Sequence, residues 1–372
     1  MNKIVITVSL ILLIGGGLTL FQMNQEERVT TQTATDPESP SQTQAEVKNT
    51  SVNDGARYAY VALGPANGIG VIDLSDNTLL ETLPAGNNPH GITFAAGNIF
   101  TTASKMGPKE MMMEPDHDDG EVMDMAMMMK LGSNEISVTD PATKQIIDTI
   151  DIGGGTHHMT ASPNGALVFA TVPSRGGVVV IDAAARVVVD FIETGVIPNY
   201  VAVSPEGTTA YVTNKGNDTV SVVDLQTNTV TKNITVGVRP DHMVISADGQ
   251  SVYITNAGDD TVSIIDASSN TLVNTVAVGE TPHGIGISRD NSNVYVANTE
   301  TKDISVIAVK SVEVVNTIAV GSEVEHLEVD PDSGNIFVNS EDEQSIFVIN
   351  PDTGEIDNTI EIGAEPHQLV VN

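Results

Sequence analysis

Three features of the sequence predict an all-β fold, a seven-bladed β-propeller with four antiparallel strands in each blade. Glycines recur every 42 residues from Gly153 to Gly363, a regular spacing typical of a repeated unit that stacks on copies of itself. Each unit contains four short runs with the alternation of β-strands, separated by turn residues. An aromatic residue recurs in the second run, and its occurrences give the number of blades: Tyr60, Phe100, Phe169, Tyr211, Tyr253, Tyr295 and Phe337.

The clearest unit shows how the strands are assigned. Residues 283–288 are expected to form the first strand, 294–298 the second, 303–309 the third and 313–320 the fourth. The first strand of a propeller blade lines the centre of the ring. Because the chain enters at a second strand and ends after a first strand, residues 367–371, the last strand is expected to complete the N-terminal blade and close the ring. Aspartates that end third strands are expected to cap the following turns: Asp140, Asp182, Asp224 and Asp266.

The chain divides into three parts. Residues 1–21 contain a long uncharged apolar run, which predicts export through either a signal peptide or a membrane anchor, to a periplasmic or extracellular location. Residues 22–56 are polar and predict a disordered linker. Residues 57–372 are expected to form the propeller, which an insertion at residues 104–133 interrupts.

The composition excludes some partners. The 16 Lys and Arg residues are outnumbered by 49 Asp and Glu residues, which gives a formal net charge of -33. This charge repels nucleic acids and anionic lipids, so we expect contact with a membrane only through the N-terminal segment. It favours metal ions as partners, although acidity also serves to keep an exported protein soluble. Cysteine is absent, which excludes disulfides and thiolate metal sites.

The repeats resemble a known propeller family. Residues 211–214 read Tyr-Val-Thr-Asn, residues 237–240 read Gly-Val-Arg-Pro, and residues 246–249 form a Ser-Ala-Asp-Gly turn. Together they resemble the YVTN-family β-propeller repeat, over roughly residues 57–372. The resemblance implies an exported seven-bladed propeller. It does not give the chemistry, because this family includes binding, surface-layer and redox proteins.

Histidines gather at the start of the predicted first strands, just after the repeat glycine. The fourth residue after the repeat glycine is His90, His157, Asn199, Asp241, His283, Glu325 or His367. The fifth residue is a histidine in three blades: His158, His242 and His326. Inner strands all enter the ring from one face, so we expect these side chains to converge at one opening and to bind a metal ion.

The non-histidine residues at this level have a related role. Asn199, Asp241 and Glu325 are expected either to bind the metal too or to fix the imidazole tautomers. The alternative is that repeat duplication placed the histidines and that they bond to neighbouring loops. Successive strand residues also point to opposite sides, so the two sets of histidines could lie at different depths.

The insertion is rich in methionine. It contains His117 and nine of the thirteen methionines: Met106, Met111, Met112, Met113, Met123, Met125, Met127, Met128 and Met129. Thioethers favour Cu(I) and imidazole accepts either copper state, so the combination indicates copper over zinc, calcium or magnesium. Neighbouring strands run in opposite directions, so the loop between a second and a third strand is expected on the same face as the loop that leads into the first strand. The insertion is therefore expected to lie near the histidines and to bind or gate copper there. The alternative is a short helix whose methionines pack against the propeller or a partner.

These observations predict an exported copper-binding propeller, with a redox protein or a copper-delivery protein as a further partner. The histidine ring resembles in outline the copper propellers of nitrous oxide reductase and thiocyanate dehydrogenase, which implies a redox site and, for an enzyme, a copper-dependent oxidoreductase. No catalytic residue is assigned. One alternative is a non-catalytic scaffold that binds proteins or envelope polymers. Another is a haem-type redox propeller, similar to the cytochrome nitrite reductases.

Overall fold

The computed structural model describes residues 9–14, 17–22, 57–103 and 135–371. The chain forms two units, Met1–Thr50 and Ser51–Asn372. In the first unit, β1 (Ser9–Ile14) pairs antiparallel with β2 (Gly17–Gln22). Among the described residues, no helix is long and apolar enough to cross a membrane. The predicted polar linker and the methionine-rich insertion lie outside these residues.

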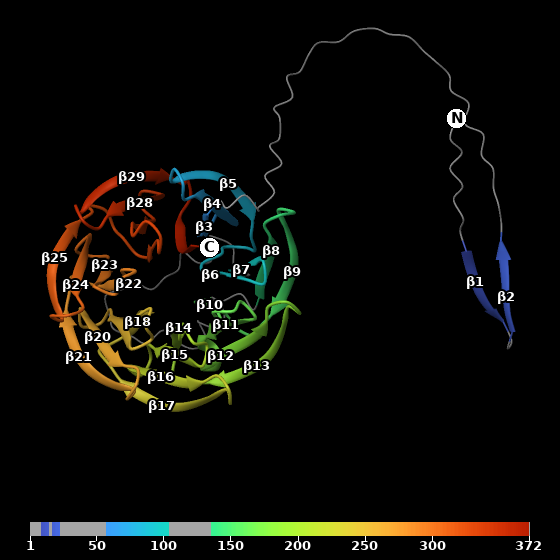
Figure 1. Cartoon of the computed structure of the whole chain (residues 1–372), viewed down its shortest axis with the longest axis horizontal. Coiled ribbons are helices and arrows are strands. Elements are labelled where there is room, and N and C mark those ends of the chain that lie inside the picture. Colours follow the sequence, from blue (N-terminus) through green and yellow to red (C-terminus); the bar gives the residue numbers. More distant parts are fainter. Residues whose placement is uncertain (1–8, 15–16, 23–56, 104–134, 372) are drawn as a thin grey trace, which may run out of the picture. The chain divides into compact units, whose positions relative to one another are not determined.

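The second unit is a ring of seven four-stranded antiparallel sheets, as predicted (Figure 1). The innermost strands are β30 (Pro366–Val371), β6 (Ile92–Ala95), β10 (Met159–Ala161), β14 (Pro198–Val203), β18 (Pro240–Ile245), β22 (Pro282–Ile287) and β26 (Leu327–Val329). The second strands are β3 (Tyr58–Leu63), β7 (Asn98–Ala103), β11 (Leu167–Val172), β15 (Thr209–Asn214), β19 (Ser251–Asn256), β23 (Asn293–Asn298) and β27 (Ile336–Ser340).

The third strands are β4 (Gly68–Asp73), β8 (Glu135–Asp140), β12 (Gly177–Asp182), β16 (Thr219–Asp224), β20 (Thr261–Asp266), β24 (Asp303–Ala308) and β28 (Ser345–Asn350). The outer strands are β5 (Thr78–Pro84), β9 (Gln145–Asp151), β13 (Val187–Glu193), β17 (Thr229–Thr235), β21 (Thr271–Ala277), β25 (Glu313–Ala319) and β29 (Glu355–Glu361). A short 3-10 turn, η1 (Pro173–Arg175), follows β11.

The last strand closes the ring. β30 pairs antiparallel with β3, so that Val370 lies opposite Tyr60 in the N-terminal blade. The two ends of the propeller are thereby joined by backbone hydrogen bonds, and β3 is not left as an edge strand. This closure was predicted from the order of strands along the chain.

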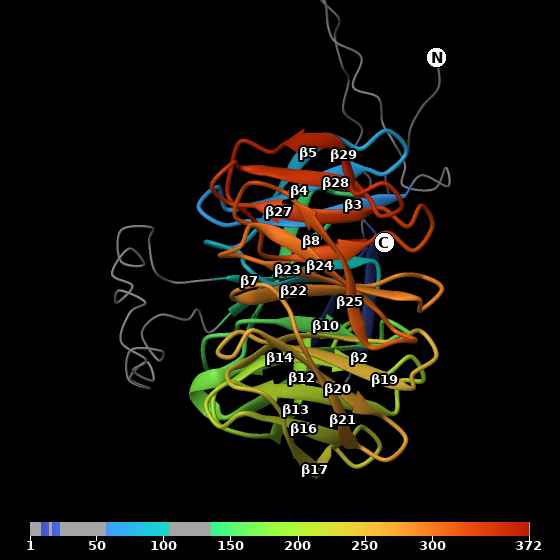
Figure 2. The same ribbon diagram turned by 90° about the vertical axis from the view of Figure 1, so that its left-hand side faces the viewer.

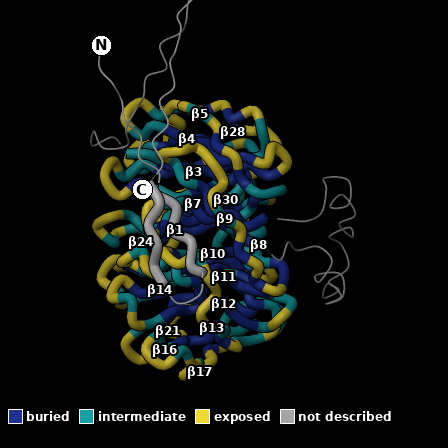
Figure 3. The backbone as a smooth tube through the Cα atoms, turned by 90° about the vertical axis from the view of Figure 1, so that its right-hand side faces the viewer, coloured by how far each residue is buried: buried dark blue, intermediate teal, exposed yellow. Residues whose placement is uncertain are grey.

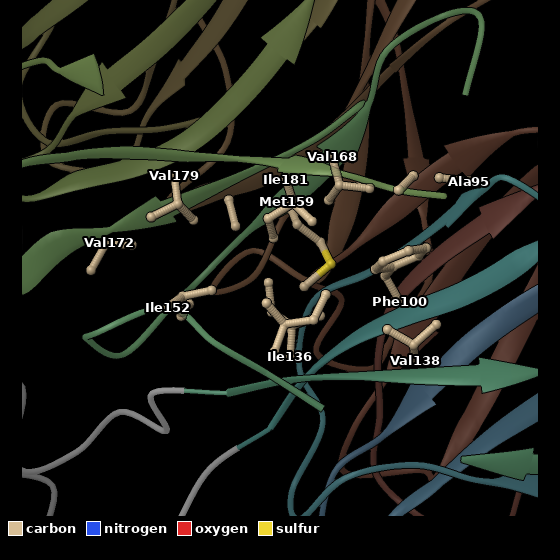
Figure 4. Close-up of a cluster of buried hydrophobic side chains, with 13 residues drawn as sticks. Ala95, Phe100, Ile136, Val138, Ile152, Met159, Val168, Val172, Val179 and Ile181 are labelled. Atoms are coloured by element: carbon tan, nitrogen blue, oxygen red, sulfur yellow. The ribbon is translucent and has the colours of Figure 1, made fainter. Parts of the chain in front are cut away.

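The hydrophobic core lies between neighbouring blades, which stack face to face around the ring (Figure 2). Figure 4 shows one such layer, in which Phe100 and Val138 of one blade pack with Met159 and Val179 of the next. The seven aromatic residues used to count the blades are all buried. Exposed residues lie mainly in turns and outer strands (Figure 3). A single blade has no covered face of its own, so stacking explains why the unit is repeated.

The repeat glycines serve two purposes. A Cβ atom on Gly195 would lie 2.4 Å from Cγ of Asn214, whose side-chain amide donates to Ser221 in the same blade. Glycine is therefore needed for close packing against the last residue of the Tyr-Val-Thr-Asn sequence. By contrast, Gly153 has a φ of 71°, which favours glycine for its backbone conformation.

The aspartates at the ends of the third strands cap turns, as predicted. The Oδ1 atom of Asp140 accepts a hydrogen bond of 2.8 Å from the Ala142 N–H. Equivalent bonds of 2.7 to 2.8 Å from backbone N–H groups are accepted by Asp182, Asp224 and Asp266. These aspartates stabilise the tight turn between the third and outer strands.

Candidate metal centre

Second-strand threonines position the histidines. The hydroxyl of Thr255 accepts from the His242 N–H at 3.0 Å and donates to the His283 carbonyl of the next blade at 2.9 Å. Thr171 and Thr213 make the same pair of bonds in their blades. Each threonine thus joins two adjacent inner strands at the level where the predicted ligands begin, which fixes their relative heights.

The structure brings five histidines together in two overlapping groups, and a sixth lies beside them. In the first imidazole group (His90, His326 and His367), one ring nitrogen from each residue lies within 4.8 Å of the others. The second imidazole group (His242, His283 and His326) meets the same limit and shares His326 with the first. The ring of His157 lies beside the first group, with its centroid 4.8 Å from that of His90.

The sequence predicted that the histidines begin the inner strands. The structure shows this for only some of them. His242 and His283 belong to β18 and β22, whereas His90 and His326 lie in the segments just before β6 and β26. The inner strands β10 and β26 have three residues each, compared with six in β18 and β22. His326 nevertheless belongs to both groups, and hydrogen bonds with Asn339 of β27 hold its backbone in place.

Several imidazole nitrogens are buried without a partner. Among the described residues, none forms a hydrogen bond to Nδ1 of His90, His157 or His283, or to Nε2 of His326. Leaving a buried polar atom unsatisfied costs free energy of the order of 1–3 kcal/mol. Neighbouring ring nitrogens without partners are the arrangement that a metal ion would satisfy, so these residues fit such a ligand.

Burial favours the neutral form of several of these histidines. Burial lowers the pKa of His90, His242 and His326 well below the usual 6.5, with nearby imidazoles adding to the effect. Burial also lowers the pKa of His283, and it lowers that of His157 to about 4. Neutral imidazole has a free lone pair, which is the form that binds a metal.

His158 is set apart from the two groups. Its ring stacks on Tyr200, with 3.4 Å between centroids, and lies 6.4 Å from the ring of His242. The Val201 N–H donates to its Nδ1 at 3.4 Å, and Nε2 of Gln368 lies 2.8 Å from its own Nε2. Both ring nitrogens of His158 therefore have neighbours, whereas His90, His157, His283 and His326 each have one that lacks a partner among the described residues.

Asp241 is a buried carboxylate beside the second imidazole group. It accepts a hydrogen bond from the Asn199 side-chain amide and lies 3.2 Å from the Lys215 ammonium and 3.9 Å from Nε2 of His283. Burial alone would raise the pKa of Asp241, but Lys215 and the nearby histidines hold it well below its usual range. Asp241 is therefore ionised, and Asn199 holds it in place.

Glu325 and Glu341 form a carboxyl pair beside the first imidazole group. An oxygen of Glu341 lies 2.6 Å from Nδ1 of His367. Burial and the Glu341 carboxylate raise the pKa of Glu325 to about 8, so Glu325 is protonated at neutral pH and can donate to its neighbour. Burial would also raise the pKa of Glu341, but its contact with His367 lowers it instead. A carboxylate on one ring nitrogen fixes the imidazole tautomer.

The sequence reasoning missed Lys215 and Glu341. Each is the first residue after a second strand, β15 or β27, and each reaches a residue 26 positions later in the next blade, at Asp241 and His367 respectively. Because this offset is constant, aligning the repeats of the sequence would have placed Lys215 and Glu341 beside the predicted ligands of the next blade. Gly64 follows β3 in the same way, and a Cβ atom there would lie 2.5 Å from Nε2 of His367.

The methionines of the insertion and His117 lie outside the described residues. The strand that leads into the insertion, β7, ends at Ala103. The preceding residue, Thr102, accepts a hydrogen bond of 3.0 Å from the His90 N–H and donates its own N–H to the Gly91 carbonyl. The described chain therefore stops next to the first imidazole group.

Comparisons with known proteins agree on the fold. Residues 199–290 match the YNCE-like beta-propeller family, which confirms the resemblance to propeller repeats, and residues 258–364 match the arylesterase family. A comparison with curated protein sequences finds no match. Each family match covers less than a third of the chain.

Three solved structures share the architecture. A functionally unknown protein from Desulfotomaculum acetoxidans has a TM-score of 0.69 at 13% identity, over 84% of this chain and 98% of its own. The periplasmic gluconolactonase PpgL of Pseudomonas aeruginosa has a TM-score of 0.65 at 18% identity, over 85% and 99%. Hydrazine synthase of Kuenenia stuttgartiensis has a TM-score of 0.63 at 14% identity, over 84% and 100%. At these identities the similarity establishes the fold alone.

Proposed function

We propose that this protein is an exported propeller that binds copper at the two imidazole groups. The observation that carries the proposal is the convergence of imidazoles, four of which, His90, His157, His283 and His326, each have a buried ring nitrogen without a partner among the described residues. Imidazole binds both Cu(I) and Cu(II). Export is supported by the apolar N-terminal run and by the similarity to a gluconolactonase described as periplasmic.

The two groups would bind separate ions. One ion would be held by the first imidazole group, His90, His326 and His367. A second position would be formed by the second group, His242, His283 and His326, and His157 lies beside the first group. Glu341 orients the ring of His367. Copper, when bound, supplies one-electron redox chemistry or is itself the cargo.

The preference for copper over zinc rests on the methionine-rich insertion. Its thioethers are soft ligands that select Cu(I). The chain enters it from Ala103, next to the residue that holds the His90 backbone. In the proposed function, these methionines capture Cu(I) and pass it to the imidazoles.

The test is metal analysis of the protein purified without chelators, followed by copper titration. Wild-type protein is expected to bind copper tightly, and the combined change of His90, His283 and His367 to Ala is expected to abolish tight binding while the circular dichroism spectrum is preserved. His158→Phe is the matched control, because both nitrogens of His158 already have neighbours, and it is expected to keep copper. Unchanged affinity in the triple variant would refute the site.

The role of the insertion can be tested separately. Deleting residues 106–130 should slow loading with Cu(I) more than loading with Cu(II), because only the thioethers discriminate between the two states. Stopped-flow loading with each ion gives the comparison. Equal slowing of both would exclude the soft-ligand role while leaving the imidazole site standing.

A further inference from the structure

Gln368 follows His367 in the innermost strand β30, and its side chain reaches two other blades. Its Oε1 atom accepts a hydrogen bond of 3.1 Å from the N–H of Ile92, two residues after His90. Its Nε2 atom lies 2.8 Å from Nε2 of His158, in the segment before β10. One amide therefore connects three blades beside the first imidazole group, to which His90 and His367 belong.

The direction of the strand explains why His367 and Gln368 have different neighbours. Successive side chains of a strand point to opposite sides, and on an innermost strand these sides face the two adjacent blades. His367 contacts Glu341, which follows β27 in the blade on one side. Gln368 contacts Ile92 at the start of β6, in the blade on the other side. This pair of residues thus ties a ligand of the first group to both neighbouring blades.

The backbone that carries His90 is held by side chains. β6 begins only at Ile92, so His90 lies before the strand. The Thr102 hydroxyl accepts hydrogen bonds from the N–H groups of His90 and Gly91, at 3.0 and 2.9 Å. The next N–H along the chain, that of Ile92, donates to Gln368. Because buried backbone N–H groups are nearly always paired, Gln368 completes the set of acceptors that fixes this segment.

One position of the repeat serves two purposes. Two of the histidines at the fifth residue after the repeat glycine join the imidazole groups. At the same position, His158 accepts a hydrogen bond from the Val201 N–H and Gln368 accepts one from the Ile92 N–H. In both cases the donor is the sixth residue after the repeat glycine of the following blade. A side chain at this position that joins neither group thus holds the backbone of the next blade.

We propose that Gln368 is a positioning residue of the first imidazole group, which sets the place of His90 relative to His367. Gln368 follows one of these ligands in the chain, and its amide holds the backbone beside the other. The two imidazole rings lie 4.7 Å apart. The inference rests on the proposed copper function, because the partners that orient metal ligands contribute to metal affinity.

The first measurement uses the metal-free full chain. Gln368→Met keeps the length of the side chain and removes its polar contacts, so the Ile92 amide should exchange its hydrogen about 10-fold faster, as measured by NMR. Gln368→Glu keeps an oxygen that accepts from this amide and should restore slow exchange. Gln250→Met, at an exposed position of a turn, is the matched control and should leave the Ile92 amide unchanged. Equally slow exchange in Gln368→Met and the wild type would overturn the proposal.

Copper titration then tests the link to the site. Gln368→Met should weaken the tighter binding phase by about 10-fold and leave the weaker phase unchanged. The electron paramagnetic resonance spectrum of the first Cu(II) bound should also change, since the ligand geometry changes; a general loss of stability would not alter this spectrum.

Two outcomes of the titration would contradict the inference. Faster exchange at Ile92 with wild-type copper affinity in Gln368→Met would remove the positioning role alone. Equal weakening of both phases with an unchanged spectrum would show that Gln368 only stabilises the fold. Failure of the wild-type protein to bind copper would instead remove the proposed function, and this inference with it.

Discussion

The two imidazole groups share His326, but a carboxylate lies beside the first group, whereas a carboxylate paired with an ammonium lies beside the second. In the first group, the Glu341 carboxylate contacts His367. In the second, the Lys215 ammonium pairs with Asp241, which in turn faces His283. Lys215 and Glu341 occupy the same place in the repeat, directly after the second strand. A repeated backbone has therefore given equivalent imidazoles different electrostatic surroundings, and we expect the first group to bind cations more tightly.

The largest effect is expected from the shared residue. His326→Ala removes a ligand from both groups, so copper affinity should fall by more than the roughly 10- to 100-fold that loss of an outer partner costs. Copper titration against a competing chelator measures it. If the variant lost affinity in only one of two binding phases, the two groups would not share this residue.

A smaller and selective effect is expected from Glu341→Gln. The amide keeps the shape but loses the charge that orients His367, so the tighter binding phase should weaken by about 10-fold. The weaker phase should not change. Equal weakening of both phases would show that the charge of Glu341 acts on both imidazole groups and not on the ring of His367 alone.

Lys215→Gln should act in the opposite direction. Removing a positive charge next to Asp241 lowers the repulsion of a bound cation, and the weaker phase should strengthen by roughly 3- to 10-fold. The same titration serves for this variant, and raising the salt concentration should reduce the gain. A loss of affinity would mean that Lys215 is needed to hold Asp241 in position.

The smallest effect concerns the metal-free protein and the pH. Burial holds the pKa values of His90, His283 and His326 in the folded state below 6.5, and that of His157 at about 4. As the pH falls through 6.5, the unfolded chain takes up protons before the folded one does, so the free energy of unfolding should fall between pH 6.5 and about 4. Urea unfolding at several pH values should show a shallower fall in the variant lacking His90, His283 and His367. An identical slope in both proteins would show that these imidazoles are not buried.

The sequence was sufficient for the parts of the fold that the 42-residue period controls. The blade count followed from Tyr60 and its equivalents, and the pairing of β30 with β3 followed from the order of strands. Boundaries differed by about one residue, as in β22, predicted at 283–288 and observed at Pro282–Ile287. Such shifts are expected where turns and strands meet.

The arrangement of side chains in the two imidazole groups was only partly predictable from the sequence. Convergence of the histidines follows from the direction of the inner strands, but their depth depends on where each strand begins. His158 stacks on Tyr200 instead of joining a group, although His242 and His326 hold the same repeat position and do join one. Glu341 reaches His367 across a blade boundary, a contact that depends on side-chain packing between repeats and not on the pattern within one repeat.

Anomalous scattering at the copper absorption edge from crystals of the copper-loaded protein tests the central claim most directly. We predict copper peaks within bonding distance of the imidazole nitrogens of the two groups, which are formed by His90, His326 and His367 and by His242, His283 and His326. Copper peaks that lie only elsewhere on the propeller, with the imidazoles at the mouth left unbound, would contradict it.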